Sequence, residues 1–443
     1  DGNGNAIKAQ LFDASGAKLG SEFLVNTVTA SSQFTPNVTN LTGGGFVITW
    51  DDWSSFDMKA QVYDANGMRV GGEFAVNTLT SGAQEYGDVT GLVGGGFVAT
   101  WRTTDTTGDG AGQSVKAQIF SATGVKIGGE FRVNTATTGD QYSPVTTALS
   151  NGGFVVTWYT TDAVQDGSQG AIKAQVFSAT GVKVGSEFLV NTQGVNLQND
   201  PAITALGDGG FFISWATFDA AQDGSGSAIK GQVFSATGAR VGGEMLINTL
   251  GAGSQSLADV TTLADGRILA TWVTTPDGFS GFEIKGQIFR PNDAPVITSN
   301  GGSASAALSV AEGNTAVTAV AASDAVGPQA VRYAITGGAD AAKFMIDTVT
   351  GVLSFVAAPD FEAPTDANAD RVYDVIVSAS DGELSTVQAL AVTLTNVNEG
   401  LAIDGGTGAV TIAENTAAVS VVHATDIDGT APTYAIIGGA DAA

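Results

Sequence analysis

The chain contains no cysteine and a single histidine, His423, which removes the material for several common chemistries. Without cysteine there is no disulfide framework and no thiolate to serve as nucleophile or metal ligand. One histidine does not support a histidine-based metal site, and it is distant in sequence from most of the chain's acidic residues. Catalysis based on these residue types is therefore not expected.

Positive charge is scarce as well, with 18 Lys and Arg against 44 Asp and Glu and a net charge of -26. Phosphate polymers and anionic lipid surfaces require the opposite charge, so nucleic acid and membrane surfaces are disfavoured and divalent cations are favoured. No apolar run reaches the roughly 20 residues that a membrane-spanning helix needs. Residues 1–8 resemble the middle of a later repeat and residues 434–443 nearly repeat 333–342, so we expect a segment of a longer protein; no secretion leader is visible at residue 1.

What the chain has is a repeat across residues 1–290. Tryptophans fall at Trp50, Trp101, Trp158, Trp215 and Trp272. Each is followed by a Lys-(Ala/Gly)-Gln element, and in the first four cases a Glu-Phe-x-Val-Asn-Thr-like element comes next. Steps of 51 and 57 residues between the tryptophans indicate stacked copies of one supersecondary unit.

Each copy contains four short apolar runs separated by Gly, Asp, Asn or Thr, which read as strands. In one copy they are 201–206, 210–215, 228–234 and 244–248, and Ser-Ala-Thr-Gly at 121–124, 178–181 and 235–238 supplies hairpin turns. Four antiparallel strands per repeat predict an all-β chain with a β-propeller of about five blades, and an array of β-sandwiches is the alternative. The run at 22–26 either completes the last blade, near residue 287, or belongs with 8–12 to an earlier blade.

The polar residues common to all copies are expected to be architectural. We expect the Lys of one strand and the Glu of the next to form an ion pair, as for Lys116 and Glu130, and the repeated Gln and Asn to bind backbone groups. The Trp and Phe series should form the core between blades. Residues found in one copy alone, notably Asp51-Asp52-Trp53 and Arg102, are candidates for a glycan platform.

The loops after three of the tryptophans carry pairs of aspartates beside glycine. They read either as ordinary turns or as weak calcium sites, since calcium favours several oxygen ligands on a flexible loop. The residues are Asp105 and Asp109, Asp162 and Asp166, and Asp219 and Asp223.

Two sequence motifs of the repeat resemble repeats in very large secreted bacterial proteins of the RTX and biofilm-adhesin type. They are Gly-Gly-Glu-Phe-x-Val-Asn-Thr and Gly-Gly-Phe-Val-Val-Thr-Trp. The resemblance covers residues 1–290 and implies an extracellular, calcium-rich setting at the bacterial cell surface. It assigns no ligand.

The pattern changes at residue 291, where Val310-Ala-Glu-Gly313, Pro359-Asp-Phe-Glu362, Tyr373-Asp-Val-Ile-Val377 and Asn396-Val-Asn-Glu399 follow in order. About 100 residues of alternating strands suggest a Greek-key sandwich. The motifs resemble those of a bacterial cadherin-like domain over 291–398, with an incomplete second one over 399–443.

That resemblance implies calcium between consecutive domains, held by acidic residues from three segments. The matching residues are Glu312, Asp360, Glu362, Asn398, Glu399, Asp426 and Asp428. At the junction with the repeats, Asp293, Asp324 and Asp381 form a weaker candidate, for which a metal-free hinge is the alternative.

From these observations we expect a non-enzymatic, secreted adhesin or surface-structure segment, in which calcium stiffens cadherin-like modules that present a propeller to glycans or other surface proteins. A carbohydrate-cleaving propeller enzyme is the competing hypothesis, and a self-associating scaffold is the third. A cluster of unpaired Asp, Glu, Tyr and Arg at one face of the ring would favour the enzyme.

Overall fold

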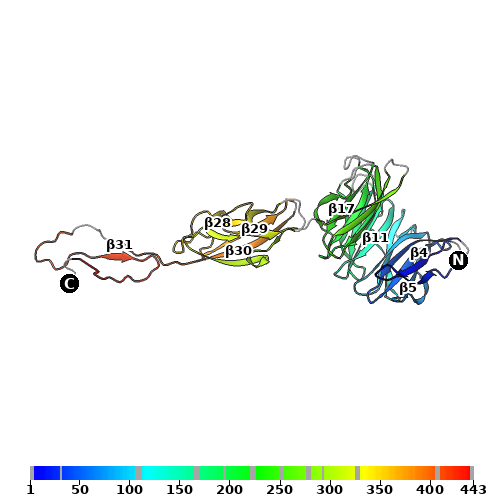
Figure 1. The fold of residues 1–443 in the computed structure, drawn as a ribbon, viewed down its shortest axis with the longest axis horizontal. Coiled ribbons are helices and arrows are strands. Elements are labelled where there is room, and N and C mark those ends of the chain that lie inside the picture. Colours follow the sequence, from blue (N-terminus) through cyan, green and yellow to red (C-terminus); the bar gives the residue numbers. More distant parts are fainter. Residues whose placement is uncertain are drawn as a thin grey trace. The chain divides into compact units, whose positions relative to one another are not determined.

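The structure is a computed structural model that describes residues 4–29, 32–105, 112–162, 170–192, 196–219, 226–249, 253–275, 281–291, 294–324, 330–382, 384–404 and 410–439. The chain forms two compact units, residues 1–291 and 292–443, and each is described by itself. Regular structure in the described residues is β-strand apart from two short 3-10 turns (Figure 1). Among these residues there is no helix long and apolar enough to cross a membrane.

The repeat unit consists of antiparallel sheets in chain order, here named sheets A to F. Sheet A pairs β1 (Lys8–Phe12) with β2 (Lys18–Leu24). Sheets B to E each contain four strands in sequential order, and sheet F contains three. Their strands are β3 (Gln33–Asn40), β4 (Gly45–Asp52), β5 (Asp57–Asp64), β6 (Arg69–Ala75); β7 (Gln84–Gly91), β8 (Phe97–Thr103), β9 (Ser114–Phe120), β10 (Lys126–Arg132); β11 (Gln141–Ala148), β12 (Phe154–Thr160), β13 (Ala171–Phe177), β14 (Lys183–Leu189); β15 (Gln198–Ala205), β16 (Phe211–Thr217), β17 (Ala228–Phe234), β18 (Arg240–Leu246); and β19 (Ser254–Thr262), β20 (Ile268–Thr275), β21 (Glu283–Phe289).

These strands follow from the sequence pattern. The four strands predicted for a complete copy are present in each of sheets B to E, and the third strand of sheet E matches its expected range of 228–234. The glycine of each Ser-Ala-Thr-Gly turn has a positive φ, as at Gly124 with φ of 82°, which an L-residue with a side chain rarely adopts. The turn chemistry therefore sets the hairpin between the third and fourth strands.

Each apolar core lies between two successive sheets. Trp101 of sheet C packs with Val47 and Met58 of sheet B, and Trp158 of sheet D packs with Val98 and Val115 of sheet C. The tryptophans of sheets B to E are almost completely buried. This confirms the expectation that the Trp and Phe series form the core between repeats. Figure 1 shows the sheets succeeding one another from blue to green.

Closure of the repeats into a ring is not observed. β2 pairs with β1, with Lys8 opposite Leu24, instead of completing the sheet of β21. In the part of the chain that the structure describes, β21 pairs with β20 alone. The arrangement in which 22–26 completes the last blade is therefore wrong, because the adjacent hairpin already satisfies that strand.

The second unit encloses its core between two sheets. The four-stranded sheet has the order β23-β30-β29-β26, with β23 parallel to β30, and the three-stranded sheet has the order β24-β28-β27. Leu353, Tyr373, Val377 and Leu390 lie in the core. The strands are β22 (Val296–Ile297), β23 (Ser305–Ala311), β24 (Ala316–Ala319), β25 (Ala322–Ser323), β26 (Arg332–Gly337), β27 (Phe344–Ile346), β28 (Val352–Phe355), β29 (Val372–Ser380), β30 (Ser385–Thr395), β31 (Ala402–Asp404) and β32 (His423–Thr425), with 3-10 turns η1 (Asn300–Gly302) and η2 (Ala341–Lys343).

Candidate functional site

A bulge recurs near the start of the first strand of sheets B to F. In sheet B, Phe34 pairs with Asp51 and Asn37 with Thr49, so the first strand carries one extra residue. The extra residue has a positive φ in every copy, although it is never glycine. The five residues are Thr35, Tyr86, Ser143, Asp200 and Leu257. Such a backbone conformation costs on the order of 1–3 kcal/mol per residue, and strain of this kind gathers at functional sites.

The repeat symmetry is broken beside these bulges. The residue after each core tryptophan pairs with the residue before the bulge, and both positions change type from sheet to sheet. The pairs are Asp51 with Phe34, Arg102 with Glu85, Tyr159 with Tyr142, Ala216 with Asn199, and Val273 with Ser256. A reaction centre needs such an asymmetric set of residues, and the common repeat positions cannot supply it.

Asp51 is the most unusual carboxylate of this set. Its side chain is only 4% exposed, and Oδ2 accepts hydrogen bonds from the Thr35 hydroxyl and, at 3.0 Å, from the Tyr86 N–H. Among the described residues, Oδ1 is buried without a hydrogen-bond partner. Burial raises the pKa of Asp51 to about 6, and the nearby Glu85 adds to the rise while Thr35, the Tyr86 N–H and Arg102 oppose it. This carboxyl group can therefore exchange a proton near neutral pH.

Arg102 connects Asp51 to its neighbours. Its guanidinium forms an ion pair with Glu85 and lies 4.5 Å from the centre of the Tyr86 ring and 5.6 Å from that of Tyr142. Its Nε is buried and, among the described residues, has no hydrogen-bond partner. A buried donor and a buried acceptor without partners thus occur in one group of interacting residues, at a cost of about 1–3 kcal/mol each.

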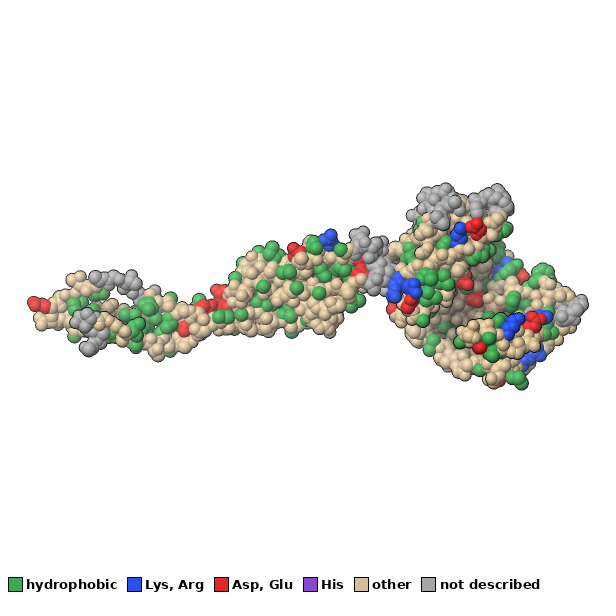
Figure 2. All heavy atoms as spheres, viewed as in Figure 1, with side chains coloured by type: hydrophobic (Ala, Val, Ile, Leu, Met, Phe, Trp, Pro, Cys, Tyr) green, Lys and Arg blue, Asp and Glu red, His purple; other side chains and the backbone are tan. Residues whose placement is uncertain are grey.

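Aromatic side chains continue this group into the next sheet. The rings of Tyr142 and Tyr159 stack with centroids 5.8 Å apart, and the Tyr142 hydroxyl donates to Asp140 Oδ2 at 2.9 Å. Burial and the Asp140 carboxylate raise the pKa of Tyr142, while burial and Asp200 raise that of Tyr159. Figure 2 shows the repeat unit hollowed between its early and late sheets, with acidic side chains visible in the hollow.

The sequence identified part of this site. Asp51 and Arg102 were expected as candidates, and the structure brings them together, whereas Asp52 is bound by the Ser54 N–H and hydroxyl in its own turn. Trp53 packs on Phe34 with ring centroids 4.7 Å apart. Five further residues of the site were not predicted, although each lies at a position where the repeats differ in residue type: Glu85, Tyr86, Tyr142, Tyr159 and Asp200.

The expected Lys–Glu pair is confirmed in four hairpins, three of them buried, whereas Lys59 and Glu73, both described residues, form no ion pair with each other. Lys116 Nζ lies 3.2 Å from Glu130 Oε1, and both side chains are about nine-tenths buried. The repeated Gln and Asn bind backbone groups as predicted, for example Gln118 to the Ile119 carbonyl and Asn134 to the Val115 N–H. These residues are architectural.

Some of the aspartates expected as weak calcium ligands lie in the described residues, and the others lie outside them. Asp105 Oδ2 lies 3.3 Å from Lys116, Asp162 Oδ2 lies 4.0 Å from Lys173, and the Asp219 N–H binds the Thr217 hydroxyl. The first two are therefore partners of the repeat lysines. Outside the described residues lie Asp109, Asp166, Asp223 and Asp293.

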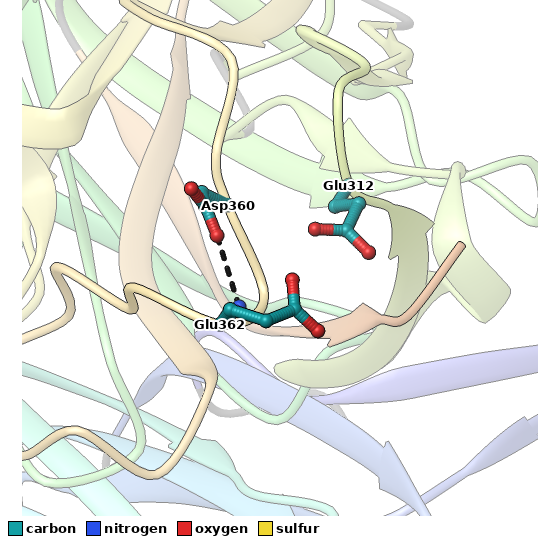
Figure 3. Close-up of side chains that lie close together, drawn as sticks. All are labelled: Glu312, Asp360 and Glu362. Carbon is teal, nitrogen blue, oxygen red and sulfur yellow. Dashed lines mark hydrogen bonds between the residues drawn. The ribbon is translucent and has the colours of Figure 1, made fainter. Parts of the chain in front are cut away.

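Two acidic groups with metal-ligand spacing lie in the second unit, and they share Glu362. Carboxylate oxygens of Glu312, Asp360 and Glu362 lie within 4.8 Å of one another, as do those of Glu362, Glu399 and Asp428. Figure 3 shows the Glu312 and Glu362 carboxylates facing each other, with Asp360 accepting the Glu362 N–H at 2.9 Å. The Oε2 atom of Glu362 is buried and, among the described residues, has no hydrogen-bond partner.

These groups contain five of the seven residues expected at this junction. Asn398 instead donates to the Glu399 carbonyl, and Asp426 accepts the Asp428 N–H in a turn. Asp324 and Asp381 belong to neither group, and Asp381 Oδ1 accepts the Leu384 N–H. Partial removal from water and the neighbouring carboxylates raise the pKa values of Glu362 and Glu399.

No protein-family model matches the chain, and no curated protein matches it. Similar solved structures include a protein of unknown function from Dyadobacter fermentans, with 11% identity, a TM-score of 0.43, and coverage of 61% of this chain and 80% of that one. An endo-arabinase from Bacteroides thetaiotaomicron has 16% identity and a TM-score of 0.37, covering 57% of this chain and 92% of that one. An alpha-L-arabinofuranosidase of Fusarium graminearum, solved with arabinobiose, has 8% identity and a TM-score of 0.40, covering 57% and 80%.

The expected non-enzymatic adhesin is corrected by these comparisons, because the two neighbours above with a stated activity are an endo-arabinase and an arabinofuranosidase. That prediction is withdrawn, and with it the statement that the segment is not an enzyme. Identities of 8% and 16% transfer neither a residue nor a substrate to this chain. The function is therefore argued from its own side chains.

Proposed function

We propose that the repeat unit cleaves a neutral glycan at the site formed by Asp51, Glu85 and Arg102. The observation that carries the proposal is the buried Asp51 carboxyl group, which has a raised pKa and a partnerless Oδ1 next to an Arg-paired glutamate. Two carboxyl groups in different environments are the usual requirement for glycoside hydrolysis. The net charge of -26 favours a neutral over an acidic glycan.

In this mechanism Asp51 is the general acid. Its proton passes to the glycosidic oxygen as the bond from that oxygen to the anomeric carbon breaks. Glu85, oriented by Arg102, is the second carboxylate; it either takes a proton from the attacking water or attacks the anomeric carbon, after which water releases the sugar. Arg102 forms the ion pair that holds this second group in place, and the Tyr86 ring, 50% exposed, offers a face for a sugar ring.

The test is hydrolysis of arabinan, xylan and galactan, read out as new reducing ends. Asp51→Asn should lower the rate at least 100-fold while the protein stays folded, as expected for loss of a general acid. Asp88→Asn is the matched control, because burial raises the pKa of Asp88 to about 6 as well, yet this group binds the Thr146 N–H and not Asp51, Glu85 or Arg102. Failure of the wild type to cleave any of these, or equal rates for wild type and Asp51→Asn, would refute the proposal.

The repeats that carry this site are proposed to be blades of a β-propeller. Support comes from the first strands, since β3, β7, β11, β15 and β19 each contact the next in order. The Asp259 carboxylate of sheet F, three sheets further on, adds to the raised pKa of Asp88 in sheet C, and first strands that curve around an axis would bring these two groups near each other. Spin labels on single cysteines introduced at residues 88 and 259 should report a short distance, which an extended stack would not give.

A second proposal concerns the second unit. We propose that it is a cadherin-like module of a secreted, cell-surface protein and that it binds calcium through Glu312, Asp360, Glu362, Glu399 and Asp428. An all-oxygen donor set with a buried, partnerless Glu362 Oε2 suits this ion. The bound ion would offset the repulsion among the carboxylates and so stabilise the segment between Thr395 and Asp428.

Titration calorimetry with calcium chloride tests this proposal on the whole chain. We expect binding that Glu362→Gln weakens at least tenfold and that Asp347→Asn leaves unchanged. Asp347 is a suitable control because its carboxylate is occupied by the Val349 and Thr350 N–H groups of a turn. Equal affinity of both variants would place the ion elsewhere, and no heat of binding would remove the site.

A further inference from the structure

The residues beside the bulges form a row of contacts from sheet B to sheet D, and Asp200 extends this row into sheet E. Asp51 of sheet B accepts the N–H of Tyr86 in sheet C. Arg102 of sheet C lies over both Tyr86 and Tyr142, and Tyr142 belongs to sheet D. The row therefore runs from sheet B to sheet C and from sheet C to sheet D, and it stays at the strand end where Asp51 lies.

The row continues through sheets D and E. Tyr142 stacks on Tyr159 within sheet D, and the Asp200 carboxylate of sheet E contributes to the raised pKa of Tyr159. Asp200 in turn accepts the N–H of Leu257, the bulge residue of sheet F. Every link is made by a residue whose type differs between the repeats, so the row is not a by-product of the architecture.

Several members hold their rings in defined positions. The Tyr142 hydroxyl donates to Asp140 and accepts a hydrogen bond from Gln113 Nε2 at 3.4 Å. Tyr159 packs tightly against Gly170, where an added Cβ would lie 2.7 Å from the tyrosine hydroxyl. Both rings remain partly exposed. Fixed, partly exposed aromatic rings are the surfaces on which sugar rings stack.

The length of the row indicates the size of the ligand. Arg102 lies 5.6 Å from the centre of the Tyr142 ring, and that ring lies 5.8 Å from the ring of Tyr159. The row therefore extends beyond the width of a single sugar ring. The charge of Arg102 is already balanced by Glu85, so the polar groups along the row favour hydroxyl-bearing over acidic units.

We propose that the row from Asp51 to Asp200 binds successive units of a linear neutral polysaccharide, so that cleavage at Asp51 occurs within the chain and Tyr142 and Tyr159 hold units beyond the cleaved bond. This rests on the proposed function, which supplies the cleavage at Asp51. Tyr159 acts here as a positioning residue, because it lies a full sheet away from the sheet that carries Arg102 and Glu85.

The experiment uses the full chain with arabino- and xylo-oligosaccharides of two to eight units. We expect kcat/KM to rise at least tenfold from dimer to octamer. Tyr159→Ala should raise KM for the octamer about tenfold with kcat nearly constant, and it should affect the dimer much less. Tyr159→Phe keeps the ring and should restore the octamer KM. If kcat/KM is independent of length, or if Tyr159→Ala affects dimer and octamer equally, the extended row is refuted.

Binding to Asp51→Asn, measured by affinity electrophoresis in the same oligosaccharides, separates this inference from the proposed function. Length-dependent binding without cleavage by the wild type would support the row and refute the cleavage. Cleavage without length dependence would support the proposed function and refute the row. Absence of both binding and cleavage would refute both.

Discussion

Glu130 in sheet C accepts a hydrogen bond from the backbone N–H of Thr78 in sheet B at 2.7 Å, while its other oxygen binds Lys116. Two neighbouring sheets are thus joined by one carboxylate. The same contact recurs between Glu73 and Thr27 and between Glu187 and Thr135. The repeated glutamate therefore stabilises the stacking of the repeats as well as its own hairpin.

This contact predicts that Glu130→Gln lowers stability. Loss of the charge leaves buried Lys116 with Asp105 as its remaining acidic partner, and we expect a cost of roughly 2–4 kcal/mol in urea unfolding followed by tryptophan fluorescence. Glu22→Gln is the control, because the Lys8–Glu22 pair is more than half exposed and should contribute little to stability. Equal effects of the two substitutions would contradict the interpretation.

Because the pKa of Asp51 is raised, we expect the folded protein to lose stability as the pH rises. Its folded pKa of about 6 lies above the ordinary value of 3.8, so the folded state binds the proton more tightly. The contribution of protonated Asp51 to the free energy of unfolding is complete below about pH 3.8. It is lost as the pH rises through 6, a change of about 3 kcal/mol. Asp51→Asn should therefore be more stable than the wild type at pH 8 and not at pH 4.

Urea unfolding at both pH values measures this effect. Asp13→Asn is the control of opposite sign, because hydrogen bonds from Ser15 and neighbouring N–H groups lower the pKa of Asp13. That substitution should remove stability above pH 4. If Asp51→Asn is no more stable than the wild type at pH 8, burial of the ionised Asp51 carboxylate does not destabilise the folded protein.

The regular part of the fold was predictable because it is encoded locally and repeatedly. Gly124 sets a hairpin by its positive φ, and Lys116 and Glu130 meet because that hairpin places them opposite each other. Ring closure was not predictable in the same way, since it depends on a contact between residues about 260 apart. The chain instead pairs β2 with the adjacent β1, which requires only a short loop.

The candidate site was only partly predictable. Asp51 and Arg102 were recognised because each is unique to one copy. Tyr142 and Asp200 were not, because their relation to Asp51 depends on the bulge, which brings the ends of neighbouring first strands together. The acidic groups around Glu362 were expected through motif resemblance, but Asp426 is used by its own turn, which the motif does not reveal.

The repeats also contain a compensating pair of residues, Phe212 and Gly231. A Cβ at Gly231 would collide with the Phe212 ring, while the equivalent pairs in sheets B, C and D combine a valine with an alanine. Gly231→Ala should therefore cost roughly 1–3 kcal/mol by overpacking, and adding Phe212→Val should restore most of it. Urea unfolding of the two single variants and the double variant measures the coupling, and additive effects would contradict it.

The acidic groups of the second unit predict that this unit becomes more stable on acidification in the absence of calcium. Partial burial and neighbouring carboxylates raise the pKa values of Glu362 and Glu399 above the ordinary 4.5, so the folded state binds protons more tightly than the unfolded chain. Stability is then complete below the unfolded value and is lost as the pH rises through the folded values. Calcium should abolish this dependence, because the ion supplies the missing positive charge.

Hydrogen-exchange protection factors of the β30 amides, measured on the full chain at pH 4 and pH 7, report on this unit, since all tryptophans lie in the repeats. Protection should be greater at pH 4 without calcium and equal at both pH values with millimolar calcium. Glu362→Gln should reduce the difference without calcium, because it removes the carboxylate that the two acidic groups share. Protection that falls on acidification in the calcium-free protein would show that these carboxylates are stabilised as anions by the fold itself, and the case for a cation there would be lost.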